Sequence, residues 1–407
     1  MQDSLKIGPL LATLLVAGNM IGAGVYLLPA SLAPFGTSSL MGWLAAAGGA
    51  IALAGVFAIL GRLRPDADGL LDYPRIALHP FLGFVAWIAY WVGCPLSNVA
   101  IALAAVGYLT SLFPALSGAV PTLIALLGVI WLFVLINLAG ARTVTGLGGA
   151  ALALGLLPVL SAIVLGLAAF DPALFAAAWS PEGKSLSQTV PGVVLLVFWA
   201  FTGLECANAI AAKVRNPARD LPIAALGGVL LAGTIYILAC VAVQGVIPPA
   251  ELARSTAPFA DVVTRLAGPI AGTLVAIFAI IKAFGTLGGW ILVTVETARA
   301  GALAGYFPRF LTEADPAVTP RRGLFFSGIL MSVIAVTTVA PTLAKQFNAL
   351  ISLTVATTMM TYGLCCIALV ILARSIAAPG RRLAAQALGL AALAFSLWVI
   401  WTWIASL

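Results

Sequence analysis

Ionisable side chains inside the apolar stretches of this sequence are few, and they are the first candidates for chemistry. Glu205 is the one carboxylate near the centre of an apolar run, and Lys282 is the one cation well inside such a run. In a membrane-spanning helix, an ionisable group usually faces the bundle interior or a water-filled cavity. Glu205 is therefore predicted to be a proton site or a gating partner, unless it only ties helices together. Lys282 either extends its amine toward the bilayer surface or holds a fixed positive charge in place of a coupling ion. A salt bridge between Lys282 and Glu205 is a further possibility.

A second candidate is the glycine-rich stretch GNMIGAGVYLLPA at 18–30. Glycine and proline are poor helix formers, so this stretch predicts a helix that is broken near Gly22–Ala23–Gly24. The freed N–H groups would suit an anion such as a carboxylate, and the freed carbonyls would suit an ammonium group. The alternative is a surface of small residues for close helix packing.

Two tryptophans lie well inside apolar runs and close to glycine, Trp199 in FWAFTG and Trp290 in TLGGW. A desolvated tryptophan face attracts guanidinium or ammonium groups by roughly 2 kcal/mol. The two rings therefore predict a cation-binding pocket, although both could simply pack in the core.

A stripe of Tyr90, Cys94, Asn98 and Ile101 repeats at helical spacing, so these side chains share one face of a helix. Asn98 gives this apolar helix a polar group. Such stripes either line a site or join helices.

The elements that must position these residues are membrane-spanning helices. The 407 residues are 62% hydrophobic and 8% charged, with a mean hydropathy of +1.14, against about a quarter charged in soluble domains. Apolar runs long enough to cross the hydrocarbon core recur along the chain. We expect one all-α, polytopic membrane domain over 1–407, with about eleven spans at 8–34, 40–61, 81–113, 120–140, 146–170, 190–212, 223–247, 266–298, 323–341, 346–373 and 383–406.

The breaks and the charges predict how these spans are arranged. The first and sixth spans each carry a break, the sixth at Gly203, so we expect two five-helix units at about 8–170 and 190–373 and an extra helix at about 383–406. An odd number of spans inverts the second unit relative to the first, as in secondary transporters. With the N-terminus in the cytoplasm, fifteen basic residues lie inside, including Lys6, Arg142, Lys213 and Arg215, and four lie outside, namely Lys184, Arg254, Arg265 and Lys345.

Motifs for an enzyme, a cofactor or a metal are absent from the sequence. It has no G-x-S-x-G, no H-E-x-x-H and no phosphate loop, which also argues against an ATP-driven pump. All five cysteines fall in apolar segments, which argues against disulfides and zinc sites. The net charge of +7 reflects loop orientation, and no basic patch indicates nucleic-acid binding. No cleavable signal peptide is expected.

Four segments resemble the bacterial basic amino acid/polyamine antiporters of the amino acid–polyamine–organocation superfamily, and among these most of all the arginine/agmatine antiporters. They are GNMIGAGVYLLPASLAPFG at 18–36, YWVGCPLSNVAIALAAVGYLTSLFP at 90–114, FWAFTGLECANAIAAKVRNPARDLPIA at 198–224 and TLGGWILVTVETARA at 286–300. The resemblance extends from about residue 5 to about residue 405. It implies a five-plus-five inverted-repeat fold with discontinuous first and sixth spans. It also implies exchange of a cationic amino acid such as arginine for its decarboxylated amine such as agmatine, by alternating access.

The resemblance also implies site residues. The expected substrate-binding residues are Asn19, Ile21, Gly22, Ala23, Gly24, Gly93, Cys94, Asn98, Ile101, Trp199, Thr202, Trp290 and Thr354. Of these, Asn19 and the Ala23–Gly24 backbone are expected to meet the amino acid end of the substrate, and Trp199 its cationic side chain. The expected gating or proton-coupling residues are Glu205, Tyr73, Tyr90 and Lys282, of which Lys282 stands where the family has a small residue.

Several positions depart from the family pattern. Ala23 replaces a serine, Thr202 replaces a larger apolar residue, and Ile101 replaces a methionine. Relatives have twelve spans, of which the last two help to form a dimer, so eleven spans weaken the expectation of a homodimer and place the C-terminus outside.

The sequence therefore predicts an antiporter of a cationic amino acid and its amine in the cytoplasmic membrane of a bacterium, with the N-terminus inside and the lipid bilayer as its surroundings. The alternative is a proton-coupled symporter or exporter of neutral amino acids, which Ala23 and Lys282 favour. A channel is disfavoured because no continuous polar lining is visible.

Overall fold

The computed structural model describes residues 7–65, 67, 69–140, 144, 146, 151, 154–205, 214, 216–312 and 318–407. Over these residues the chain is helical, with one isolated bridge between Ile7 and Val214 and no strand, which confirms the all-α prediction. Outside the described residues lie Lys6, Arg142, Lys213 and Arg215, part of the predicted span at 146–170 and the last part of the span at 190–212.

The α-helices are α1 (Pro9–Met20), α2 (Leu28–Leu32), α3 (Ser39–Leu63), α4 (Asp72–Ala77), α5 (Pro80–Leu112), α6 (Ala119–Leu138), α8 (Leu157–Ala168), α9 (Pro172–Ala177), α10 (Leu186–Val197), α12 (Pro217–Gln244), α13 (Pro249–Leu252), α14 (Pro258–Ala267), α15 (Pro269–Leu303), α16 (Arg321–Thr337), α17 (Leu343–Leu372) and α18 (Pro379–Ala405). Short 3₁₀ segments include η2 (Ala23–Tyr26), η3 (Ala33–Ser38) and η5 (Phe198–Phe201).

Seven of the described helical segments are long and apolar enough to cross a membrane, which makes the chain a multi-pass membrane protein. These segments are Leu28–Leu63, Pro80–Leu112, Ala119–Leu138, Arg219–Gln244, Pro269–Leu303, Leu343–Ser375 and Pro379–Ala405. Shorter apolar helices occupy Pro9–Met20, Leu157–Ala168 and Leu186–Phe201. Two of these three short helices, α1 and α10, end at the breaks that the sequence singled out.

The first break separates α1 from α2. After α1 ends at Met20, Gly22 adopts an extended backbone (φ −92°, ψ −162°) and the 3₁₀ turn η2 follows. Helix resumes at Leu28 with Pro29 in its first turn, where the missing proline N–H costs nothing. The glycines and the proline therefore stop and restart the helix within eight residues.

The second break follows α10. Helix passes into η5, Thr202 is extended (φ −63°, ψ 141°), and Gly203 has φ +99°, a left-handed conformation that favours glycine. The segments η2 and η5 pack against each other, although about 175 residues separate them in the chain. The two breaks thus meet at one place in the bundle.

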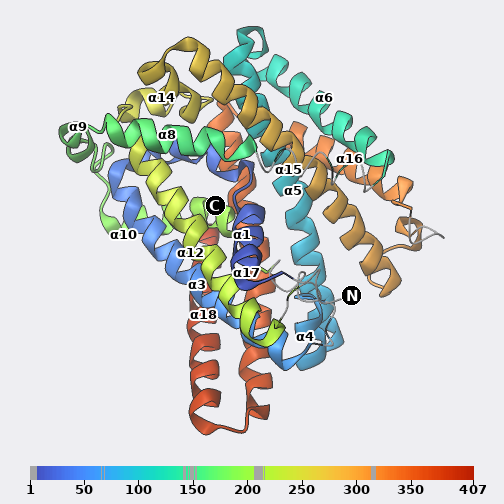
Figure 1. The fold of residues 1–407 in the computed structure, drawn as a ribbon. Coiled ribbons are helices and arrows are strands. Elements are labelled where there is room, and N and C mark those ends of the chain that lie inside the picture. Colours follow the sequence, from blue (N-terminus) through green and yellow to red (C-terminus); the bar gives the residue numbers. More distant parts are fainter. Residues whose placement is uncertain are drawn as a thin grey trace.

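Helix α5 forms the interior of the bundle. In its most apolar window 83% of the residues are buried, against 28% in the corresponding windows of α6 and α18. Helices α6, α15, α16 and α17 all pack against α5. Helices α17 and α18 lie side by side and project together from one end of the molecule (Figure 1). The faces of α6 and α18 that carry exposed leucines are suited to lipid.

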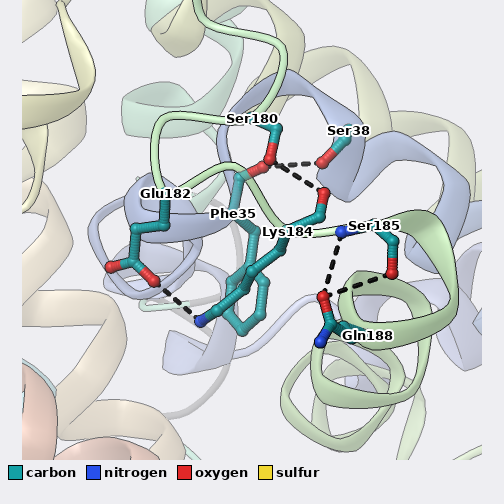
Figure 2. Close-up of polar contacts among 7 residues, drawn as sticks. All are labelled: Phe35, Ser38, Ser180, Glu182, Lys184, Ser185 and Gln188. Atoms are coloured by element: carbon teal, nitrogen blue, oxygen red, sulfur yellow. Dashed lines mark hydrogen bonds and ion pairs between the residues drawn. The ribbon is translucent and has the colours of Figure 1, made fainter.

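A loop contacts the segment that follows the first break. The N–H groups of Thr37 and Ser38 in η3 donate to carbonyls of the segment that follows α9. In the same loop the Lys184 amine lies 5.0 Å from the centroid of the Phe35 ring and 2.7 Å from the Glu182 carboxylate (Figure 2). These contacts tie η3 to the loop that leads into α10, the other helix that ends at a break.

The sequence prediction has no helix between the spans at 223–247 and 266–298, whereas the structure has α13 and α14 there. Helix α14 is amphipathic, with Phe259, Val262 and Val263 on its buried face. Phe259 packs edge-on against Tyr26 of η2, with the ring centroids 5.9 Å apart. This helix covers the first break from one side and is too short and too polar to be read as a span.

Candidate functional site

Two neighbouring cavities lie where the breaks meet α5, α15 and α17. The first is lined by Asn19, Met20, Gly22, Ala23, Gly24, Ser97, Ile101, Trp199, Ala200, Thr202, Thr286 and Trp290. The second is lined by Tyr90, Gly93, Cys94, Ser97, Thr202, Glu205, Trp290, Thr354 and Thr358. Three residues, Ser97, Thr202 and Trp290, line both cavities. The cavities are therefore two halves of one elongated site.

The glycines of the first break allow side chains to approach its backbone closely. A Cβ atom on Gly24 would lie 3.0 Å from Cζ3 of Trp199, and one on Gly22 would lie 3.3 Å from Cγ2 of Thr286. Both distances are shorter than an ordinary van der Waals contact. The lack of a side chain at Gly24 therefore allows Trp199 to pack directly against the backbone of the break.

Trp199 is 4% exposed and is held on three sides. One face lies on Gly24, Phe347 of α17 packs edge-on with centroids 5.4 Å apart, and the indole N–H donates to Oγ of Ser97 at 3.0 Å. The ring also lines the first cavity, so it presents an aromatic surface to a cation there.

Glu205 lines the second cavity but not the first, and it is 6% exposed. Its carboxylate accepts hydrogen bonds from the Tyr90 hydroxyl at 3.1 Å, the Gly203 N–H at 3.0 Å and the Tyr362 hydroxyl. Glu205 is the one charged side chain among the described residues that line either cavity. A largely uncharged site with one carboxylate in its lining favours a ligand that carries a positive charge.

Tyr236 of α12 joins the two breaks from behind. Its hydroxyl lies 2.6 Å from the Met20 carbonyl oxygen and 3.1 Å from the Ala200 carbonyl oxygen, one in each break. The side chain is fully buried. The Tyr236 hydroxyl is thus a hydrogen-bond donor for carbonyl groups that have no helical partner where the two helices are interrupted.

Some of the predicted site residues do not line either cavity. Asn98 turns toward α15, where its amide donates to Oγ1 of Thr294 at 2.9 Å. Ile21 is buried at the end of α1, and Tyr73 is buried in the short helix α4. Neither cavity includes these three residues.

Lys282 also lies outside both cavities. It is 5% exposed, and its stem packs against Gly155, where an added Cβ would lie 2.3 Å from Cδ of the lysine. Among the described residues, no ion pair joins Lys282 to Glu205, whose carboxylate is held by tyrosines instead. Glu296, toward the C-terminal end of α15, pairs with Arg299 at 2.8 Å.

Sequence reasoning missed Ser97, Thr286, Thr358, Tyr362 and Tyr236. Three of these carry a periodic signal. Ser97 falls between Cys94 and Ile101 on their helical face, and Thr358 and Tyr362 follow Thr354 at intervals of four. Tyr236 has no such signal, because its role depends on two carbonyls from distant segments.

Comparisons with known proteins agree with this geometry. The family model described as amino acid permease matches residues 7–406. The chain is 35% identical over 368 residues to the putrescine transporter PotE of Escherichia coli K12, covering 90% of this chain and 84% of the relative. It is 32% identical to the PotE protein of Haemophilus influenzae over 91% of this chain and 85% of the relative. It is also 32% identical to the cadaverine/lysine antiporter of Escherichia coli K12 over 91% of this chain and 84% of the relative.

These relatives are transporters, and none is an enzyme. Broken helices that meet at a buried site are the arrangement in which secondary transporters bind small substrates. The described helices, their two breaks and a family match along nearly the whole chain lead to the same assignment, and the chain belongs to the amino acid permease family.

Proposed function

We propose that this protein is an antiporter that exchanges a cationic amino acid for its decarboxylated amine by alternating access. The observation that carries the proposal is the elongated site with the first glycine break in one cavity and Glu205 in the other. The named substrates of the relatives, putrescine and the pair cadaverine and lysine, belong to the same chemical class. Arginine and agmatine are the further pair that we propose to test.

The two exchanged molecules share a terminal cation and differ by one carboxylate. A site that accepts both must therefore recognise the cation in each case and the carboxylate in only one. The Glu205 carboxylate and the faces of Trp199 and Trp290 supply interactions for the shared cation. The backbone around Gly22–Ala23–Gly24 supplies dipoles for the amino acid end.

The proposal includes a five-plus-five inverted repeat within a single domain, with units at about 8–170 and 190–373. The paired breaks after α1 and after α10 support it, because each break falls in the first helix of one unit. We place the protein in a bacterial cytoplasmic membrane with the N-terminus inside, which the distribution of basic residues supports. Gating by Glu205, Tyr90 and Tyr73 and assembly as a homodimer are further parts of the prediction.

Transport by the purified protein in proteoliposomes tests the proposal directly. Vesicles are preloaded with arginine, agmatine, lysine, cadaverine, putrescine, alanine or buffer, and labelled arginine or labelled putrescine is added outside. We expect uptake only into vesicles that contain a cationic amino acid or an amine. Uptake of labelled alanine into empty vesicles under a pH gradient would instead support the proton-coupled transport of neutral amino acids.

The Trp199→Leu variant tests the assignment of the site. We expect it to abolish exchange while the protein remains folded, as judged by size-exclusion chromatography and thermal unfolding. Trp401→Leu is the matched control, because Trp401 is 67% exposed on α18, away from the cavities. Normal exchange by Trp199→Leu would refute the placement of the substrate beside this ring.

A further inference from the structure

Ser97 occupies the junction of the two cavities. It lies on α5, lines both cavities and is 8% exposed. Its Oγ accepts the indole N–H of Trp199 at 3.0 Å. Unlike Thr354 on α17, whose hydroxyl donates to the carbonyl four residues earlier, Ser97 makes no such bond within its own helix. The hydroxyl is therefore directed across the junction toward the tryptophan.

Trp199 depends on this contact for its orientation. The indole has one donor and no acceptor, so Ser97 uses its whole hydrogen-bonding capacity. Its other neighbours, Gly24 and Phe347, make only van der Waals contacts with the ring. Those contacts limit how far the ring can move toward either neighbour, but they do not say which way the indole N–H points, which depends on the χ1 and χ2 torsions of the side chain. Since a buried N–H without a partner is costly, the Ser97 bond selects one orientation of the ring.

We propose that Ser97 is the positioning residue of the site and orients the face of Trp199 toward the bound cation. The inference rests on the proposed function only in that a cation is the ligand of this face. The hydrogen bond itself is independent of any substrate, so the two ideas can fail separately.

Fluorine NMR tests the positioning without reference to transport. The protein is labelled with 5-fluorotryptophan, and the signal that disappears in Trp199→Phe is assigned to Trp199. We expect Ser97→Ala to shift that signal and to leave the other tryptophan signals in place. Ser111→Ala is the matched control, because Ser111 lies on the same helix and donates only to the Tyr108 carbonyl. An unchanged Trp199 signal in Ser97→Ala would overturn the proposal.

Exchange kinetics test the consequence for the substrate. We expect Ser97→Ala to raise KM about five-fold, equal to about 1 kcal/mol, with the maximal rate unchanged. The effect should be similar for the amino acid and the amine, since both present a cation. In a Trp199→Phe background, which keeps a ring but has no donor, Ser97→Ala should add nothing further.

The outcomes separate the two hypotheses. A shifted Trp199 signal together with an unchanged KM would overturn the role of Ser97 in substrate binding. A full additional loss in the Trp199→Phe background would also overturn it, because Ser97 would then act on the substrate directly. If the wild type exchanges none of the tested compounds, the proposed function fails, whereas a shifted signal still supports the hydrogen bond.

Discussion

The position of Trp199 on the first break leads to a quantitative prediction for Gly24→Ala. The new Cβ atom would lie 3.0, 3.2 and 3.6 Å from three carbon atoms of the indole ring. Carbon atoms in contact are most stable at about 3.5–4.0 Å, so the ring would have to withdraw by roughly 0.5 Å.

The surroundings leave little space for that withdrawal. Phe347 is fully buried and packs edge-on against the ring, and the Ser97 bond holds the indole N–H. Overpacking of this kind costs about 1–3 kcal/mol. If that cost falls on the substrate complex, affinity decreases by about five- to 150-fold. If it falls on the folded state, the thermal unfolding temperature decreases instead.

Exchange in proteoliposomes and thermal unfolding in detergent measure the two effects together. Gly48→Ala is the control, because an added Cβ there has no neighbour within 4 Å. The control should keep the wild-type KM and should be as stable as the wild type or slightly more so, as alanine favours helix. A wild-type KM combined with a wild-type unfolding temperature in Gly24→Ala would refute the close packing of Trp199 on the break.

Three further predictions follow from other contacts. Glu205→Gln keeps the shape of the side chain but removes its charge. KM for amines should therefore rise at least tenfold, which corresponds to about 1.4 kcal/mol. An unchanged KM would contradict the role of the carboxylate. Tyr236→Phe removes the hydroxyl that reaches both breaks and should lower the free energy of unfolding by about 1–3 kcal/mol; a loss below about 0.5 kcal/mol in chemical unfolding would argue against this bridge. Burial raises the pKa of the Asp261 carboxyl in α14 above its ordinary 3.8, despite the Ser255 hydrogen bond. The protonated carboxyl therefore contributes stability below pH 3.8, and this contribution is lost as pH rises through the raised pKa. Asp261→Asn should therefore gain stability relative to the wild type as pH rises above 3.8, and a stability difference that does not change with pH would exclude this titration.

Local properties of the sequence were enough for the class of fold and for the location of the breaks. Long apolar runs predict membrane helices because the bilayer requires internally satisfied backbone groups. Gly22, Gly24 and Gly203 mark the interruptions because glycine tolerates backbone conformations that other residues avoid. Of the residues that the sequence singled out, Gly22 and Gly24 line the first cavity and Glu205 lines the second.

Contacts between distant segments could be decided only by the tertiary structure. The sequence offers no signal that Ser97 receives the Trp199 N–H, that Tyr236 reaches both breaks, or that Tyr362 joins Tyr90 at Glu205. The sequence also left open whether Lys282 forms a salt bridge with Glu205. In the structure the stem of Lys282 packs against Gly155 instead. The physical reason is that residue type and spacing set which backbone conformation is favourable and which face of a helix is polar, whereas the partner of each side chain depends on how helices far apart in the chain pack together.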